Sequence, residues 1–231
     1  MRLENQVIAV TGAFGVLGRA MVQAALRAGA RVAALDRAPL PVDFQSGPDL
    51  LALGDIDITE DRATTAAFQQ IARHFGGLDG LVNIAGGFRW QTLAEGDPTA
   101  WDALYEMNLK TAVTASRAAL AHLVERKGGH IVNVGALGAL KAGAGMGPYA
   151  ASKAGVMRFT ESLAEEVKDR GITVNAVLPS IIDTPANRKD MPKAEFDRWV
   201  KPEALAQVIL FLLSAEAAPV NGALIAVPGR V

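Results

Sequence analysis

Short apolar runs alternate along this chain with longer stretches of helical periodicity. The apolar runs, often β-branched, predict strands over residues 6–10, 31–35, 50–56, 80–84, 130–134, 173–178 and 223–227. Between them apolar residues recur at helical spacing, for example at Phe159, Leu163, Ala164 and Val167. This alternation predicts an α/β fold of the Rossmann type, a doubly wound parallel sheet of about seven strands with helices on both faces.

The domain organisation follows from the absence of internal boundaries. No repeat, low-complexity tract or long Pro- and Ser-rich linker divides the sequence, so residues 1–231 are predicted to form a single domain. Residues 183–202 are the least regular stretch and contain three prolines and many charges. They follow a predicted strand, at the sheet edge where doubly wound sheets bind ligands, and are interpreted as a mobile substrate lid. A linker is the alternative.

Composition narrows the class of protein. The chain is 50% hydrophobic and 20% charged, as in an ordinary globular domain. Its net charge of −1 argues against nucleic acid or an anionic membrane as partner, because both reward a basic face. The lack of cysteine excludes disulfides and thiolate chemistry, and no metal site is predicted. No signal peptide or apolar stretch of about 20 residues is recognised, so we expect a cytoplasmic protein with a small-molecule partner.

A small-residue segment, 11–18, follows the first predicted strand and opens directly into a helix. Its backbone can approach a pyrophosphate, whose charge would meet the N–H groups of the helix start. Asp36 ends the second strand and can bind an adenosine ribose, which favours NAD(H), whereas Arg37 leaves NADP(H) possible. The predicted cofactor contacts here are Gly12, Phe14, Gly15, Val16, Leu17, Gly18, Asp36 and Arg37.

Tyr149 and Lys153 supply candidate chemistry. They are four residues apart and therefore share one face of a helix. A nearby ammonium stabilises a phenolate, so the pair predicts a tyrosine whose pKa is lowered toward neutral pH. Such a group suits proton transfer beside a hydride carrier.

These motifs resemble the short-chain dehydrogenase/reductase family along nearly the whole chain. The resemblance rests on three motifs, which occur in this order along the chain: the segment from Thr11-Gly12 to Gly18, Asn83-Ile84-Ala85-Gly86, and Tyr149-x-x-x-Lys153. The resemblance implies that Asn108 kinks a helix and holds a water in a proton relay, a buried structural asparagine being the alternative. It also implies further cofactor contacts at Asp57, Ile58, Asn83, Ala85, Gly86, Pro179, Ile182 and Thr184, besides Tyr149 and Lys153. Two positions depart from the family pattern: Val16 and Ser180 each replace a usual glycine.

One expected residue is missing. The family usually carries a serine 13 positions before the tyrosine, where this sequence has Ala136. Losing one donor to a developing oxyanion commonly costs about 10²–10³ in rate. Either the enzyme is impaired, or its substrate develops no oxyanion that needs the donor.

The second option fits a narrower resemblance to the dihydropteridine reductase branch of the family, which also has alanine at this place. The lid sequence and Gly86-Gly87-Phe88 are similar to that branch, whereas Asn108 and the Ala-Ser-Lys helix resemble ordinary members. The candidate substrate contacts are Phe88, Ala136, Met191 and Trp199, with Trp90 as a further wall residue. Packing of the lid on the body is the alternative role for its aromatics.

Three functions follow. The leading hypothesis is an NADH-dependent reductase of a small conjugated substrate such as quinonoid dihydropterin. The alternatives are an ordinary carbonyl reductase or alcohol dehydrogenase and a non-catalytic NAD(H)-sensing protein. Predicted helices 108–126 and 148–170 correspond to helices that pair between subunits in the family, which implies a homodimer or homotetramer.

Overall fold

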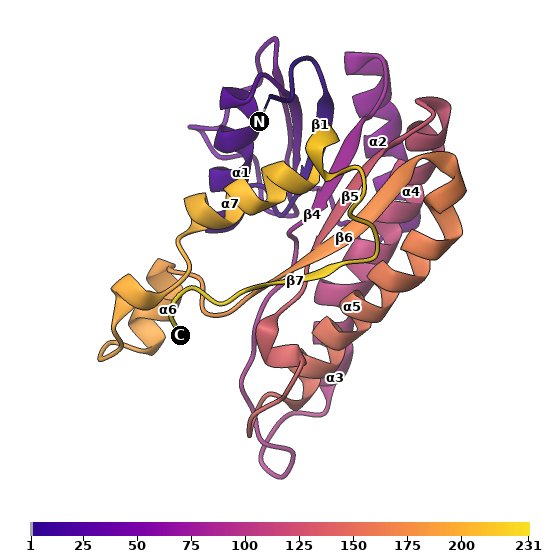
Figure 1. Cartoon of the computed structure of the whole chain (residues 1–231). Coiled ribbons are helices and arrows are strands. Elements are labelled where there is room, and N and C mark those ends of the chain that lie inside the picture. The colour runs from indigo at the N-terminus through magenta and orange to yellow at the C-terminus, as the bar shows by residue number, and fades with distance from the viewer. Residues whose placement is uncertain (1) are drawn as a thin grey trace.

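The computed structural model describes residues 2–231 and contains one seven-stranded parallel sheet of order β3-β2-β1-β4-β5-β6-β7 (Figure 1). The strands buried on both faces are near-continuous apolar runs, as expected for a parallel sheet covered by helices. The seven runs identified in the sequence all form strands, which are β1 Val7–Thr11, β2 Arg31–Leu35, β3 Leu50–Leu53, β4 Gly80–Asn83, β5 Gly129–Val134, β6 Ile172–Pro179 and β7 Leu224–Val227.

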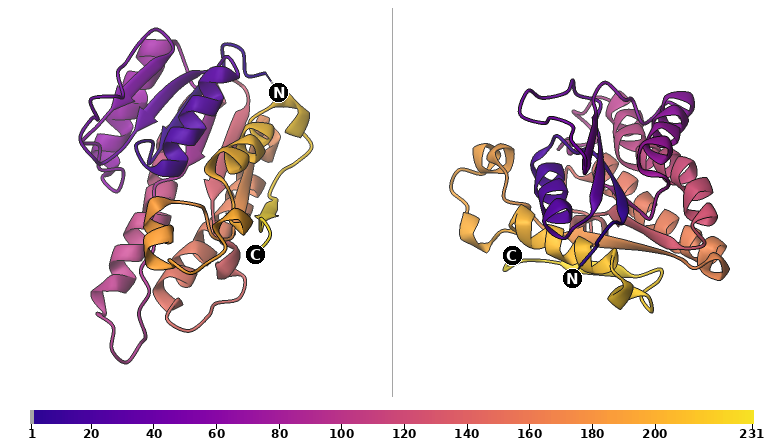
Figure 2. Two further views of the ribbon diagram at one scale, coloured as in Figure 1. Left: turned by 90° about the vertical axis from the view of Figure 1, so that its left-hand side faces the viewer. Right: turned by 90° about the horizontal axis from the view of Figure 1, so that it is seen from above.

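Helices cover both faces of this sheet, which confirms the predicted Rossmann-like class (Figure 2). One face packs on α1 and α7, and the other on α2, α4 and α5. Each pair of layers encloses its own apolar core, because every helix turns an apolar stripe to the sheet. The long helices are α1 Val16–Arg27, α2 Asp61–Phe75, α4 Thr111–Glu125, α5 Gly147–Val167 and α7 Pro202–Leu212, and the short ones α3 Thr99–Tyr105 and α6 Pro185–Asp190.

Two predicted elements differ in their bounds. β3 ends at Leu53 rather than at residue 56, because Gly54 lies against the backbone of Leu40 and Asp55 takes a left-handed conformation with φ 58°. The helix expected over 108–126 is preceded by α3 and a π-helical turn, Glu106–Lys110, before α4 begins. A π-helical turn inside a longer helix is frequently found at a functional site.

The topology places the carboxyl ends of β1 and β4 side by side at the point where the strand order reverses. Doubly wound sheets bind ligands at this point. Residues 183–202, which carry α6, project from the same edge of the sheet (Figures 1 and 2). Among residues 2–231, no helix is long and apolar enough to cross a membrane.

Candidate active site

A cleft of about 1790 Å³ opens at the carboxyl ends of the strands. It brings together segments that are far apart in the sequence, and most of the predicted site residues line it. These are Gly12, Phe14, Gly15, Val16, Leu17, Gly18, Asp36, Arg37, Asp57, Ile58, Ala85, Gly86, Phe88, Ala136, Tyr149, Lys153, Pro179, Ile182, Thr184 and Met191.

The glycine loop needs its small residues at two positions. Gly12 has φ 63°, and a Cβ there would lie 2.8 Å from the Cα of Ala85. A Cβ on Gly18 would lie 2.1 Å from the Gly12 carbonyl oxygen, so only glycine lets α1 start this close to the loop. Val16 is the first residue of α1, and its half-exposed side chain lines the cleft, with Gly15 before it in an extended conformation. The helix start therefore faces the cleft, which fits the phosphates of a dinucleotide.

Thr11 joins the two loops that meet at the switch point. Its Oγ1 accepts hydrogen bonds from the backbone N–H groups of Ile84 at 3.1 Å and Ala85 at 3.2 Å. The loop after β4 is therefore held against the glycine loop by a buried side chain. Thr11 was not among the cofactor contacts predicted from the sequence, although it begins the motif that identified the loop.

Asp36 is oriented by the backbone at the end of β2. Its Oδ2 accepts a hydrogen bond from the N–H of Phe14 at 2.9 Å, and its Oδ1 accepts one from the N–H of Ala38 at 2.9 Å. The carboxylate lines the cleft in a fixed position, with the exposed Arg37 beside it. Asp57 is similarly fixed, because the Thr59 hydroxyl and N–H donate to its carboxylate and lower its pKa.

The candidate catalytic residues, Tyr149 and Lys153, lie near the start of α5. Lys153 is buried, and its Nζ donates a hydrogen bond to the carbonyl oxygen of Val134 at 2.8 Å. Burial lowers the pKa of Lys153 to about 8. The ring of Phe88 packs edge-on against Tyr149, with centroids 4.9 Å apart.

The expectation of a lowered tyrosine pKa was wrong for this state of the protein. Burial raises the pKa of Tyr149 to about 12, because desolvation disfavours the phenolate. Lys153 does not offset this effect, since the same burial disfavours its own charge and its ammonium donates to Val134. Tyr149 therefore keeps its proton at neutral pH.

Asn108 lies in the π-helical turn and fastens three segments together. Its Oδ1 accepts from the N–H of Gly87 at 2.8 Å, and its Nδ2 donates to the Gly87 carbonyl oxygen at 3.1 Å and to Ser152 Oγ at 2.9 Å. Ser152 in turn donates to the Tyr149 carbonyl oxygen at 2.8 Å. A Cβ on Gly86 would lie 2.6 Å from Asn108 Oδ1, which explains the glycine there.

Three predicted site residues do not line the cleft. The side chain of Asn108 is buried in the contacts just described. Asn83 donates instead to Ser116 Oγ and to Asn133 Oδ1, because successive side chains of β4 point to opposite faces of the sheet. Trp199 is buried against Phe196, with centroids 4.9 Å apart. Packing of the lid, the alternative given for its aromatics, therefore describes Trp199.

Ala136 lines the cleft at the end of β5 and is 4% exposed. Its methyl group offers no hydrogen bond at the place where the family usually has a hydroxyl. Trp90, the further wall residue expected from the sequence, also lines the cleft. Other wall residues were not predicted from the sequence, and they are Met107, Leu137, Met146, Asn187 and Asp190.

The segment after β6 accommodates its substituted glycine without strain. Ser180 is absent from the non-glycine residues with positive φ in the described chain, and its Oγ donates to the Pro228 carbonyl oxygen at 2.6 Å. Thr184 begins α6, where its Oγ1 accepts from the N–H of Asn187 at 3.1 Å. Asn187 Nδ2 donates to the Ile182 carbonyl oxygen at 2.7 Å.

Comparisons with known proteins agree with this arrangement. Residues 6–195 match the family model of the short chain dehydrogenases. The 2-(S)-hydroxypropyl-CoM dehydrogenase 3 of Xanthobacter autotrophicus is 34% identical, covering 99% of this chain and 97% of its own. The 3-oxoacyl-(acyl-carrier-protein) reductase FabG of Vibrio cholerae is 35% identical, covering 99% of this chain and 98% of its own.

A solved structure shows the same fold with a cofactor. The 3-ketoacyl-(acyl-carrier-protein) reductase of Brucella melitensis, complexed with NADH, has a TM-score of 0.88 and 28% identity, and the alignment covers 99% of each chain. Its bound NADH agrees with a nicotinamide cofactor in the cleft described above. The chain therefore belongs to the short-chain dehydrogenase/reductase family and is an NAD(P)-dependent oxidoreductase.

Proposed function

We propose that this protein is an NADH-dependent reductase of a small, conjugated, electron-poor ring, with quinonoid dihydropterin as the best single candidate. The observation that carries the proposal is Ala136 at the cleft, where a carbonyl reductase would use a hydroxyl donor. A conjugated ring accepts hydride without forming a carbonyl oxyanion, so it does not need that donor. Aromatic and thioether side chains suit a flat ring, and the cleft carries them at Phe88, Trp90, Met107, Met146 and Met191.

The preference for NADH over NADPH rests on Asp36. Two backbone N–H groups hold its carboxylate in the cleft at the end of β2. A fixed negative charge at this place repels a 2′-phosphate and can accept hydrogen bonds from ribose hydroxyls. Arg37 is exposed and beside it, and it is the residue through which NADP(H) would be accepted.

The residues of the cleft divide the chemistry among them. When bound, the nicotinamide cofactor supplies hydride. Tyr149 is protonated at neutral pH and donates the proton that accompanies it. Lys153 would hold the cofactor ribose, and Asn108 positions the helix of Tyr149 through its contacts with Gly87 and Ser152. The lid segment, residues 183–202, covers the nicotinamide end through Thr184 and Met191, with Ile182 directly before it.

Replacing Ala136 by serine discriminates this reaction from ordinary carbonyl reduction. We expect Ala136→Ser to raise reduction of a simple ketone by about 10²-fold, because the hydroxyl supplies an oxyanion donor, and to change reduction of the conjugated ring by less than about threefold. Steady-state rates on both substrates test this. Ala139→Ser is the matched control, since Ala139 lies outside the cleft. An equal gain on both substrates would contradict the proposal and favour a carbonyl reductase.

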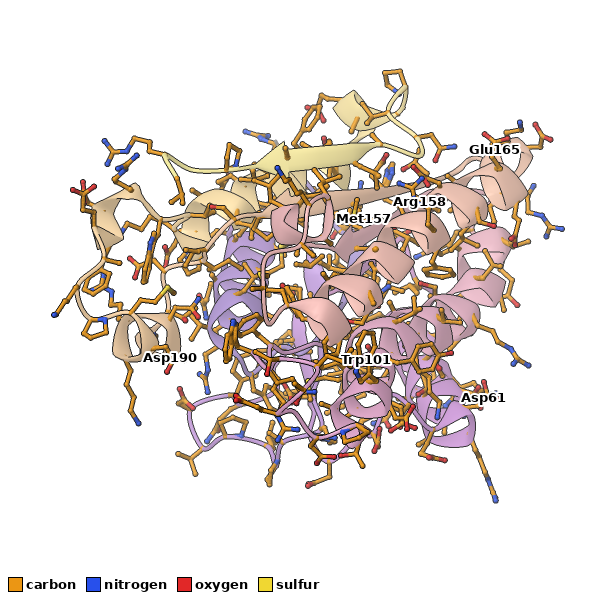
Figure 3. The ribbon with its side chains drawn as sticks, turned by 90° about the horizontal axis from the view of Figure 1, so that it is seen from below. Asp61, Trp101, Met157, Arg158, Glu165 and Asp190 are labelled. Atoms are coloured by element: carbon orange, nitrogen blue, oxygen red, sulfur yellow. The ribbon has the colours of Figure 1, made fainter. Side chains whose placement is uncertain are left out.

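We propose further that the protein is a homodimer or homotetramer built on α4 and α5. Apolar side chains remain exposed beside these helices, at Trp101, Tyr105 and Val113. Trp101 lies next to the start of α5, far from the lid residue Asp190 (Figure 3).

A further inference from the structure

A carboxylate whose side chain has little exposed surface lies at the base of the lid segment. The side chain of Asp183 is only 7% exposed. Its Oδ1 accepts from Arg188 Nε at 2.6 Å and its Oδ2 from Arg188 Nη2 at 2.9 Å, a bidentate pair. Oδ2 also accepts from Lys201 Nζ. These residues come from the start, the middle and the end of the lid segment, and we call the three the Asp183 clasp.

The backbone and an aromatic stack reinforce the clasp. The N–H of Asp183 donates to the Val200 carbonyl oxygen at 2.9 Å, so the two ends of the lid segment are also joined by the main chain. The Arg188 guanidinium lies over the ring of Phe196 at 4.8 Å, and Phe196 packs on the buried Trp199. Hydrogen bonds from Arg188 and Lys201 lower the pKa of Asp183, so the carboxylate keeps its charge to lower pH than an ordinary aspartate. The carboxylate of Asp183 therefore joins the beginning of the lid segment to Arg188 and to Lys201 near its end.

The clasp stands behind the cleft rather than in it. In the described chain, Asp183, Arg188 and Lys201 are not among the residues that line the cleft, whereas Thr184 and Asn187 are. Thr184 is the neighbour of Asp183 in sequence, and Asn187 precedes Arg188. Holding Asp183 and Arg188 in place therefore also holds Thr184 and Asn187, the cleft residues next to them in the sequence.

We infer that Asp183 is a positioning residue, which holds the lid segment in its ligand-binding arrangement before a ligand arrives. Ordering a loop costs conformational entropy, and a loop that is already ordered does not take that cost from the binding energy. The inference rests on the proposed function in one respect only, that the lid segment covers the nicotinamide end of the cofactor. Arg188 has a structural role in this inference, because its guanidinium pairs with Asp183 within the lid segment.

The test compares Asp183→Asn with Asp197→Asn. Asparagine keeps the size of the side chain but leaves Arg188 and Lys201 without their counter-charge. If the lid segment is then ordered about a tenth of the time, the Kd for NADH rises about tenfold, while kcat at saturating ligands changes much less. Backbone amide exchange over residues 184–199 should rise about tenfold as well, with the sheet unchanged. Asp197 is an exposed lid carboxylate paired with Arg230 at 3.1 Å, and its loss should change neither quantity.

Arg188→Lys is the second variant, because it keeps the charge and loses the bidentate geometry. We expect a smaller rise in exchange and in Kd than for Asp183→Asn. The inference is overturned if Asp183→Asn leaves both quantities within about twofold of the wild type, or if Asp197→Asn changes them equally. Should Asp183→Asn not fold, unchanged exchange in Arg188→Lys overturns it. Neither readout needs a substrate, so failure of the proposed reduction would be recognised separately.

Discussion

Replacing Tyr149 by phenylalanine should lower kcat for NADH-dependent reduction by about 10²–10⁴, the usual contribution of a positioned general acid. Tyr149 lines the cleft, and its pKa of about 12 means that it carries a proton to donate at neutral pH. Phenylalanine keeps the edge-on contact with Phe88, so the fold and the affinity for NADH should be retained. The loss should therefore appear in kcat rather than in NADH binding.

Steady-state kinetics and a fluorescence titration with NADH measure the two quantities separately. Tyr105→Phe is the matched control, since Tyr105 is half exposed and outside the cleft. A Tyr149→Phe variant that turns over at the wild-type rate would contradict the assigned proton donor. A biological effect that survives this change in a protein without turnover would instead favour the NAD(H)-sensing alternative.

Replacing Lys153 by methionine should abolish most activity and yet stabilise the fold. Lys153 is fully buried, and burial lowers its pKa from 10.5 to about 8, so protonating it in the folded protein is unfavourable. Removing the charge should raise the free energy of unfolding at pH 7 by about 2–3 kcal/mol, after allowance for the lost bond to Val134. Activity should fall at least about 10²-fold, because the ribose and Tyr149 lose their cationic neighbour.

The pH dependence of this gain has a definite sign. Below pH 8 the folded wild type holds a charged, buried Lys153 and bears the full cost. Between about pH 8 and 10.5 the folded state releases the proton while the unfolded state keeps it, so wild-type stability rises relative to the variant. Denaturant unfolding of both proteins across this range measures the difference, with the exposed Lys168→Met as control. A variant that is less stable at pH 7, or a gap that does not narrow with pH, would contradict the account.

The sheet was predictable because its strands are buried on both faces. Residues 80–84 and 130–134 are mainly apolar, each interrupted by one asparagine, and form β4 and β5 within one or two residues. The glycine loop was predictable because Gly12 takes a positive φ and Gly18 lies against the Gly12 carbonyl, and both constraints act within the loop. The resemblance implied a kinked helix at Asn108, but periodicity could not predict the π-helical turn before α4, since Asn108 contacts Gly87 and Ser152, 21 and 44 residues away.

The environment of the site residues was harder to predict from the sequence than their identity. The raised pKa of Tyr149 results from burial by Phe88 and other residues outside its helix. The helical spacing in the sequence identifies only Lys153 as a neighbour of Tyr149. The clasp at Asp183 likewise depends on Lys201, 18 residues away along an irregular path. Motifs identified which side chains reach the cleft, whereas their protonation and the order of the lid segment depend on tertiary contacts.

The most direct test of the central claim is the rate of NADH oxidation with freshly generated quinonoid dihydropterin, measured beside NADPH and beside a simple 3-oxoacyl thioester. The account predicts rapid turnover of the pterin, at least about tenfold faster with NADH than with NADPH, and little reduction of the thioester, whose oxyanion would lack a donor at Ala136. Rapid thioester reduction without pterin turnover, by a protein that binds NADH, would contradict it.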